Sequence, residues 1–257
     1  MGTSLAGKSV LVIGRPSGIA RAIVEAALTE GALVTVAGRD AEKLRQGYRE
    51  SALQEETTGP ETAGTQELRP GVTAETVDIT DDSSIQALAS RMGTVDHIVT
   101  TASARARGLL SDLRRESLRQ SFDTKVIGPV MLAQHFASQI SEGGSVTLFS
   151  GVAAFKPAVG YLGVAITNGA VDFLTRSLAL ELAPIRVNAL SPGVIDTGIW
   201  DALGESGKRE YFEHFRTHNP ARRIGDVEDI AQAAVFAMTN RFLTGVTLRI
   251  DGGEPLT

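Results

Sequence analysis

Short segments that are almost wholly apolar or β-branched recur along the chain, and stretches of helical length separate them. They lack the polar alternation of half-exposed strands, which is typical of strands buried on both faces of a parallel sheet. The segments span residues 9–14, 33–38, 72–80, 97–102, 145–150, 185–190 and 246–251, and the main helical stretches span 18–30, 113–138, 168–182 and 227–238. Alternation of this kind builds βαβ units with right-handed crossovers. It predicts an α/β fold, a doubly wound sheet of seven parallel strands, in a single domain over residues 1–257.

Two stretches interrupt the alternation. Residues 57–71 are polar and hold three glycines and two prolines, which predicts a mobile surface loop. Residues 196–225 directly follow a predicted strand. Ligands of an open α/β sheet lie outside the carboxyl ends of its strands, so we expect this insert to cover the binding site as a lid.

The composition excludes several kinds of protein. The formal net charge of −5 argues against a general nucleic-acid binder, and the absence of cysteine excludes disulfide and thiolate chemistry. The four histidines are too scattered for a zinc site, so no metal is expected. No apolar run reaches the ~18 residues of a membrane span, and residues 1–14 lead into a strand without the pattern of a signal peptide. We therefore expect a cytoplasmic protein.

Gly14 and Gly18 lie between the first predicted strand and the first predicted helix. Glycine there lets the chain turn tightly and lets backbone N–H groups approach a pyrophosphate at the N-terminus of the helix. Turns often need glycine for their own sake, so the pair alone is weak evidence. Its place between a strand and an amphipathic helix favours a dinucleotide site.

From this turn onward the chain resembles the short-chain dehydrogenase/reductase family over essentially its whole length. Gly14-x-x-x-Gly18-x-Ala20 is similar to the family's Gly-x-x-x-Gly-x-Gly turn, with alanine in place of the third glycine. "VDIT" resembles its adenine-contacting Asp motif, "DHIVTTAS" its strand ending in Asn-Asn-Ala-Gly, and "RVNALSPGVIDT" its Pro-Gly-x-x-x-Thr segment. The resemblance implies a Rossmann-like fold that binds a nicotinamide dinucleotide. The cofactor contacts that it implies fall on Gly14, Arg15, Ser17, Gly18, Ile19, Gly38, Arg39, Asp78, Ile79, Thr101, Ala102, Asn168, Pro192, Gly193, Ile195 and Thr197.

The end of the second strand favours NADP(H) over NAD(H). An acidic residue there would accept hydrogen bonds from a ribose 2′-hydroxyl and repel a 2′-phosphate, but the position holds Gly38, followed by Arg39. Arg15, within the glycine turn, supplies a second guanidinium that could bind the phosphate. The alternative is that both arginines are ordinary solvated side chains. Asp40 is expected to cap the following helix rather than to bind ribose.

The positions that carry catalysis in the family all hold other residues here. The family uses an Asn, a Ser and, four residues apart, a Tyr and a Lys, and the Tyr exchanges the proton of the substrate oxygen. With Arg176 as the anchor of the register, these positions fall on Lys125, Gly151, Val164 and Asn168, in that order. Val164 has no proton to give, and Gly151 has no hydroxyl. Cofactor binding can survive these replacements, whereas the ordinary proton transfer cannot.

Three residues are candidates for relocated catalysis. Lys125 is expected to point into the cleft, where a buried ammonium could act as an acid or support an oxyanion. Alternatively, Lys125 fills the space of the missing lysine and reaches the ribose or Ser150, which directly precedes the serine position. Tyr161 lies three residues before the tyrosine position, and moving it there would need an insertion inside a helix. It either packs against the protein or faces the cleft.

Two functions are therefore open from the sequence. The first is an oxidoreductase that transfers hydride to or from a carbonyl or alcohol of a small molecule, with non-standard proton chemistry. The second is an NADPH-binding protein without turnover, acting as a sensor or an assembly partner. Trp200, Tyr211, Phe212 and Phe215 either line an apolar substrate pocket or anchor the lid. By resemblance to the family, we expect a homodimer or homotetramer, with no nucleic-acid or membrane partner.

Overall fold

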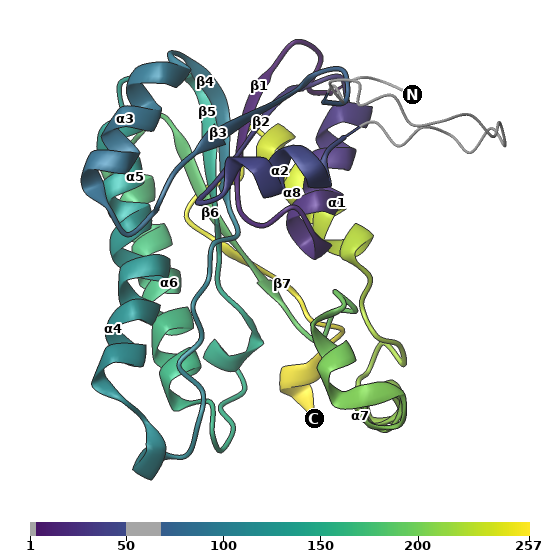
Figure 1. Cartoon of the computed structure of the whole chain (residues 1–257). Coiled ribbons are helices and arrows are strands. Elements are labelled where there is room, and N and C mark those ends of the chain that lie inside the picture. The colour runs from purple at the N-terminus through teal and green to yellow at the C-terminus, as the bar shows by residue number, and fades with distance from the viewer. Residues whose placement is uncertain (1–3, 50–67) are drawn as a thin grey trace, which may run out of the picture.

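The computed structural model describes residues 4–49 and 68–257. Seven strands form one parallel sheet in the order β3-β2-β1-β4-β5-β6-β7, which confirms the predicted doubly wound α/β fold (Figure 1). The strands are β1 Ser9–Ile13, β2 Leu33–Gly38, β3 Val72–Thr76, β4 Val95–Thr100, β5 Ile140–Phe149, β6 Arg186–Pro192 and β7 Thr247–Ile250. The helices are α1 Gly18–Thr29, α2 Ala41–Gly47, α3 Asp82–Met92, α4 Arg115–Phe122, α5 Gly128–Phe136, α6 Leu162–Glu181, α7 Gly204–His218 and α8 Val227–Thr239.

Two hydrophobic cores, one on each face of the sheet, explain why the strands are apolar throughout. Successive side chains of a strand point to opposite faces. On β1, Leu11 and Ile13 join the core under α3, α5 and α6, whereas Val10 and Val12 join the core under α1, α2 and α8. All four are at most 2% exposed. Figure 1 shows these two groups of helices on opposite sides of the sheet.

Two helices differ from the sequence-based expectation. The predicted helix at 113–138 consists of α4 and α5, joined by a π-helical turn at Asp123–Ile127. The predicted helix at 168–182 begins earlier, because α6 already begins at Leu162. Tyr161 stands at its N-cap and makes no capping hydrogen bond through its side chain. The sequence therefore carries none of the usual signals of a helix start at this point.

The insert at 196–225 contains a 3₁₀ turn, Ile199–Leu203, followed by α7. Its two ends meet, since Ile195 and Gly225 pair in a parallel bridge. Trp200 and Tyr211 lie against each other with ring centroids 4.6 Å apart, and Phe215 lies 4.9 Å from Tyr211. The aromatic side chains thus hold the 3₁₀ turn and α7 together. α7 lies at the lower right of Figure 1, beyond the end of β6.

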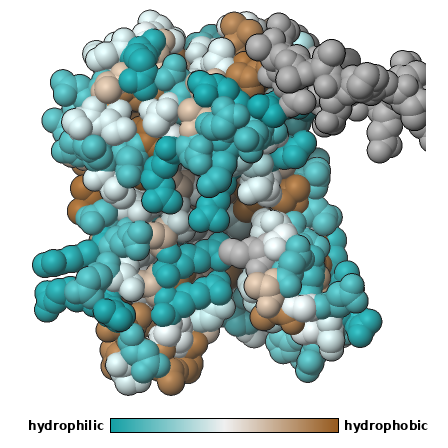
Figure 2. All heavy atoms as spheres, viewed as in Figure 1, coloured by the Kyte–Doolittle hydropathy of each residue, from teal (hydrophilic) through white to brown (hydrophobic). Residues whose placement is uncertain are grey.

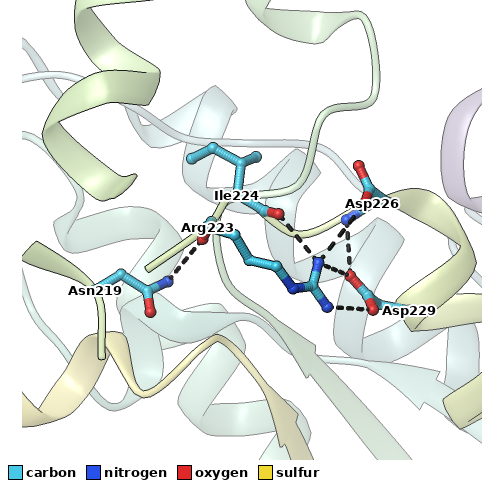
Figure 3. Close-up of polar contacts among 5 residues, drawn as sticks. All are labelled: Asn219, Arg223, Ile224, Asp226 and Asp229. Carbon is cyan, nitrogen blue, oxygen red and sulfur yellow. Dashed lines mark hydrogen bonds and ion pairs between the residues drawn. The ribbon is translucent and has the colours of Figure 1, made fainter. Parts of the chain in front are cut away.

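Arg223 fastens the end of this insert to α8. Its guanidinium donates to both carboxylate oxygens of Asp229 at 2.7 and 2.6 Å (Figure 3). Asp229 also accepts a hydrogen bond from the backbone N–H of Asp226 at 2.8 Å, which completes a capping box at the start of α8. Asn219 donates to the carbonyl oxygen of Arg223 at 3.3 Å. The base of the insert is therefore fixed to the rest of the domain.

Most of the loop predicted at 57–71 lies outside the described residues, and Leu68 pairs with Arg49 in an antiparallel bridge ahead of β3. Within the described part of the chain, no helix is long and apolar enough to cross a membrane. The same residues bring no three histidine or acidic side chains together as a metal site would need. His214 and His218 stack on α7 with ring centroids 4.3 Å apart, and both are exposed.

Candidate functional site

The turn between β1 and α1 accepts only glycine at two positions. A side chain at Gly14 would collide with the Oγ1 of Thr101. Gly18 has φ of +52°, and a Cβ there would lie 3.2 Å from the Cβ of Thr197. α1 begins at Gly18 without a side-chain hydrogen bond from Ser17 and without an acidic residue in its first turn. Its first N–H groups and the positive end of its dipole therefore suit an anion such as a pyrophosphate.

At the end of β2, Arg39 lies next to Asp40, whose carboxylate already binds Lys43. Arg39 is exposed and forms no ion pair with any residue that the structure describes. Asp40 caps α2 as predicted, because its carboxylate accepts from the backbone N–H of Lys43 at 3.0 Å and pairs with the Lys43 ammonium at 3.2 Å. The hydrogen bond from the Lys43 backbone is the main reason that the pKa of Asp40 is lowered. Gly38 leaves no acidic side chain at the strand end itself.

The other predicted cofactor residues lie at the ends of neighbouring strands. Asp78 accepts from the backbone and hydroxyl of Thr80 at 3.0 and 2.7 Å through Oδ1. Thr101 donates its N–H and its hydroxyl to the carbonyl oxygen of Ile13 at 2.8 and 3.2 Å, which ties β4 to β1. Gly193 lets β6 pass close to Asp251, since a Cβ would lie 2.7 Å from the Cα of that residue. Buried or half-buried around them are Ile19, Ile79, Ala102, Pro192 and Ile195.

The four catalytic positions of the register come together in the structure. Lys125 lies in the π-helical turn and is 8% exposed. Its ammonium donates to the carbonyl oxygen of Ser150 at 3.0 Å and to the side-chain oxygen of Asn168. Asn168 in turn donates through Nδ2 to the carbonyl oxygen of Gly151 at 3.2 Å. Val164 is buried one helical turn before Asn168 on α6, so a lysine and an asparagine carry all the polar side-chain atoms of the four positions.

Burial shifts the proton affinity of Lys125. Its pKa is lowered to about 7, chiefly because the surrounding protein desolvates the ammonium and secondly because the Arg105 guanidinium repels it. The two hydrogen bonds to Ser150 and Asn168 do not offset this burial. An amine in this state exchanges a proton near neutral pH, as a general acid or base must.

The two other catalytic candidates differ in their contacts. The hydroxyl of Ser150 donates to the main-chain carbonyl of Asn168 at 3.0 Å, so it fastens β5 to α6 and has no proton left for a ligand. Tyr161 makes no hydrogen bond to this cluster among the described residues. Its half-buried ring makes a cation–π contact with the guanidinium of Arg107, whose Cζ lies 4.8 Å from the ring centroid.

Arg105, Arg107 and Tyr211 gather beside Tyr161, and sequence reasoning did not single out these arginines. Tyr211 of α7 has its pKa raised to about 12, mainly by burial and then by Tyr161, while both arginines act in the opposite sense. The arginines come from the segment after β4, where the sequence shows several arginines between residues 105 and 119. The available signal was an Arg-Ala-Arg alternation directly after the carboxyl end of a strand.

Comparison with known proteins extends over nearly the whole chain. The family model described as Enoyl-(Acyl carrier protein) reductase matches residues 13–254. Short-chain dehydrogenase/reductase ATR9 from Stachybotrys chlorohalonatus is 32% identical over 265 residues, which cover 97% of this chain and 98% of that protein.

Solved structures also match nearly the whole chain. The crystal structure of a small-chain dehydrogenase in complex with NADPH has a TM-score of 0.75 and 29% identity, and the match covers 98% of this chain and 100% of that one. MalC Reductase/Diels-Alderase from Malbranchea aurantiaca has a TM-score of 0.85 and 27% identity, with 99% of each chain covered. The likeness spans the glycine turn and the replaced catalytic positions alike.

Proposed function

This chain belongs to the short-chain dehydrogenase/reductase family, and we propose that it is an NADP(H)-dependent oxidoreductase that moves hydride to or from a carbonyl or alcohol of a small molecule. The observation that carries the proposal is the buried ammonium of Lys125 at the centre of the four catalytic positions. It is the group of this cluster that can exchange a proton with a ligand, because the Ser150 hydroxyl already donates to a main-chain carbonyl.

The residues of the cofactor turn fit a dinucleotide. The N–H groups at the start of α1, opened by Gly14 and Gly18, would bind the pyrophosphate. Arg39 would bind the 2′-phosphate of NADP(H), and the free oxygen of Asp78 would accept from the adenine amino group. The NADPH complex of the related small-chain dehydrogenase supports this preference. When bound, the nicotinamide supplies or takes up the hydride.

Lys125 would handle the proton. An ammonium has three N–H donors, and two of them are directed to Ser150 and Asn168. The third is left for a ribose hydroxyl or for the substrate oxygen. Because its pKa is lowered to about 7, both protonation states are populated at neutral pH. The protonated form serves carbonyl reduction, and the neutral form serves alcohol oxidation.

Cofactor binding without turnover is the second candidate function, and one observation favours it. The two acceptors of the Lys125 ammonium belong to the protein itself, and they join the end of β5 to α6. A lysine so held can serve as a structural replacement for the family lysine and leave proton transfer undone. Such a protein would bind NADPH and change its assembly or its partner without oxidising the cofactor.

We further propose that the chain forms a homodimer or homotetramer. Large apolar side chains are exposed on α6, on α8 and beside β7. On α6 these are Leu162, Ile166, Phe173 and Leu180, and near α8 and β7 they are Phe236, Phe242 and Val246. Ile166, Phe173 and Leu180 recur every seven residues along one face of α6, and an exposed apolar face is typical of an interface. A cytoplasmic location stays a prediction from the sequence.

Calorimetric titration with NADPH and with NADH tests the cofactor assignment. We expect NADPH to bind at least 10-fold more tightly than NADH, and Arg39→Ala to lose roughly 10- to 100-fold in NADPH affinity, as for a charge-assisted hydrogen bond. Arg45→Ala is the matched control, since Arg45 lies on α2 and pairs with Glu42 instead. Equal affinity of the wild type for the two dinucleotides would overturn the preference for NADP(H).

Turnover of NADPH with a panel of aldehydes and ketones separates the two candidate functions. Oxidation of NADPH by the wild type, lost in Lys125→Met while NADPH affinity stays within a few-fold, supports the oxidoreductase. NADPH binding with no turnover on any member of the panel, together with a dinucleotide-dependent change of assembly in sedimentation, supports the non-catalytic function.

A further inference from the structure

The segment that follows β4 is held against α4 and against the start of α6. The hydroxyl of Ser121 donates to the carbonyl oxygen of Ala104 at 2.8 Å, and the N–H of Gly108 donates to the carbonyl oxygen of Gly160 at 3.0 Å. Between these two points Gly163 lets Ala106 come close, since a Cβ at Gly163 would lie 2.6 Å from the Ala106 carbonyl oxygen. The segment is therefore a fixed wall of the site.

Two arginines flank the buried residue of this wall. Ala106 is 1% exposed and packs inward, whereas its neighbours Arg105 and Arg107 are both exposed. Neither arginine forms an ion pair with a described residue. The Arg107 guanidinium lies over the ring of Tyr161, with Cζ 4.8 Å from the centroid, so its position is defined.

Tyr211 faces these arginines from the insert. Its ring lies in tilted contact with the rings of Trp200 and Phe215, so the insert has an aromatic cluster here. Tyr211 interacts electrostatically with Tyr161, Arg105 and Arg107, which makes the four side chains neighbours across the site. Figure 2 shows hydrophilic side chains on the wall opposite the lobe of α7, which lies at the lower right.

The electrostatics of this cluster favour an anion. The protein around Arg105 lowers the pKa of its guanidinium through desolvation, and repulsion from Arg107 and then from Arg15 adds to this effect. The repulsion from Arg105 also contributes to the lowered pKa of Lys125. The carboxyl group of Glu254 is near Tyr211, but burial raises its pKa and it pairs with neither arginine. Positive charge without an ion-pair partner among the described residues is thus concentrated beside Tyr161 and Tyr211, in a chain whose formal net charge is −5.

We propose that Arg105 and Arg107 bind an oxoanion of the substrate, a carboxylate or a phosphate, with the hydroxyls of Tyr161 and Tyr211 as additional donors and the aromatic rings against the substrate body. The inference rests on the proposed function, because it names the substrate class of the same site. Two neighbouring guanidiniums bind a carboxylate or a phosphate through paired, charge-assisted hydrogen bonds. The anion would also lessen the repulsion among the cations around Lys125.

Titration of the cofactor-free protein with benzoate, benzamide and phenyl phosphate tests the inference without any need for turnover. Emission of Trp200, the only tryptophan of the chain, reports binding because its ring lies 4.6 Å from that of Tyr211, centroid to centroid. We expect benzoate or phenyl phosphate to bind about 10- to 100-fold more tightly than the neutral benzamide. The anion that binds better identifies the group as carboxylate or phosphate.

The variant Arg105→Ala/Arg107→Ala should remove this preference, whereas Arg115→Ala should keep it. Arg115 is an exposed arginine at the start of helix α4, outside the segment that carries Arg105 and Arg107. All three side chains are exposed, so these variants are expected to fold, and circular dichroism checks this. Equal binding of benzoate and benzamide by the wild type, or an unchanged preference in the double variant, would overturn the inference.

Separate titration of the double variant with NADPH distinguishes failure of this inference from failure of the proposed function. If the double variant loses affinity for NADPH but keeps its affinity for benzoate, the arginines bind the cofactor and the inference is wrong. If the wild type binds benzoate selectively but binds no dinucleotide, the anion site stands and the proposed function fails.

Discussion

Replacement of Lys125 by methionine should change how the stability of the protein responds to pH. Lys125 is 8% exposed, and its pKa in the folded chain is lowered to about 7, whereas an unfolded lysine has a pKa of about 10.4. Between these values the unfolded chain binds a proton that the folded chain does not. Stability rises with pH wherever the unfolded state binds more protons, so Lys125 makes the wild type more stable as the pH increases from 7 toward 10.4.

The size of this effect follows from the width of the pH window. Each pH unit well above 7 contributes about 1.4 kcal/mol, and integration from pH 7 to 9.5 gives about 3 kcal/mol as an order of magnitude. Methionine has a similar length and cannot titrate. The difference in free energy of unfolding between the wild type and Lys125→Met therefore gives the pH-dependent contribution of Lys125, because the other titratable groups are common to both proteins.

Urea unfolding of the cofactor-free protein, at one protein concentration and at several pH values from 6.5 to 9.5, measures this difference. Lys43→Met is the control, since the Lys43 side chain is 76% exposed and pairs with Asp40 at the surface. A difference for Lys125→Met that stays flat over this range would refute the reasoning. It would mean that the hydrogen bonds to Ser150 and Asn168 keep the lysine charged despite its burial. The lowered pKa of Lys125 also predicts a pH dependence of turnover. The rate of carbonyl reduction should fall above pH 7, because the ammonium that donates the proton is lost.

Two further substitutions test the packing of the site and the attachment of the insert. Gly151→Ser should lower the free energy of unfolding in urea by about 1–3 kcal/mol, because its Cβ would lie 2.8 Å from the Asn168 amide nitrogen. Gly169→Ser, with open space around its Cβ position, is the control, and equal stability of both variants would contradict this reasoning. Asp229→Ala should cost about 1 kcal/mol in the same assay, because it removes the acceptor of the Asp226 N–H and the partner of Arg223. An unchanged urea midpoint for Asp229→Ala would show that the capping box of α8 adds nothing to stability.

The fold and the cofactor turn could be predicted from the sequence because both depend on local and repeated patterns. A strand such as β1, with both faces buried, has to be apolar at every position, and that pattern is visible in the sequence. The cofactor turn could be predicted from Gly14 and Gly18, because the turn has no space for a side chain at these positions. The role of Asp40 as a cap could be predicted for the same reason, since its partner is only three residues away.

The remaining features depend on contacts between distant segments. The start of α6 at Leu162 has no capping residue, and it is defined by packing against the segment after β4. That packing turns Ala106 inward and Arg105 and Arg107 outward, so two arginines that look like a solvated face in the sequence become neighbours of Tyr161. No pattern within one segment contains this information.

The four replaced catalytic positions form an interlocked set, not four independent losses. Asn168 takes up the space beside Gly151 that a serine side chain would need, and its amide oxygen accepts from the ammonium of Lys125. A lysine at position 168 would bring two ammonium groups together in a buried site, which disfavours the charge on both. A single reversion toward the family residues therefore leaves a neighbour overlapping or unpaired, and cannot by itself rebuild the family's proton transfer. The dinucleotide turn uses backbone N–H groups and glycines, so it is independent of this set, and cofactor binding could persist while the proton chemistry changed.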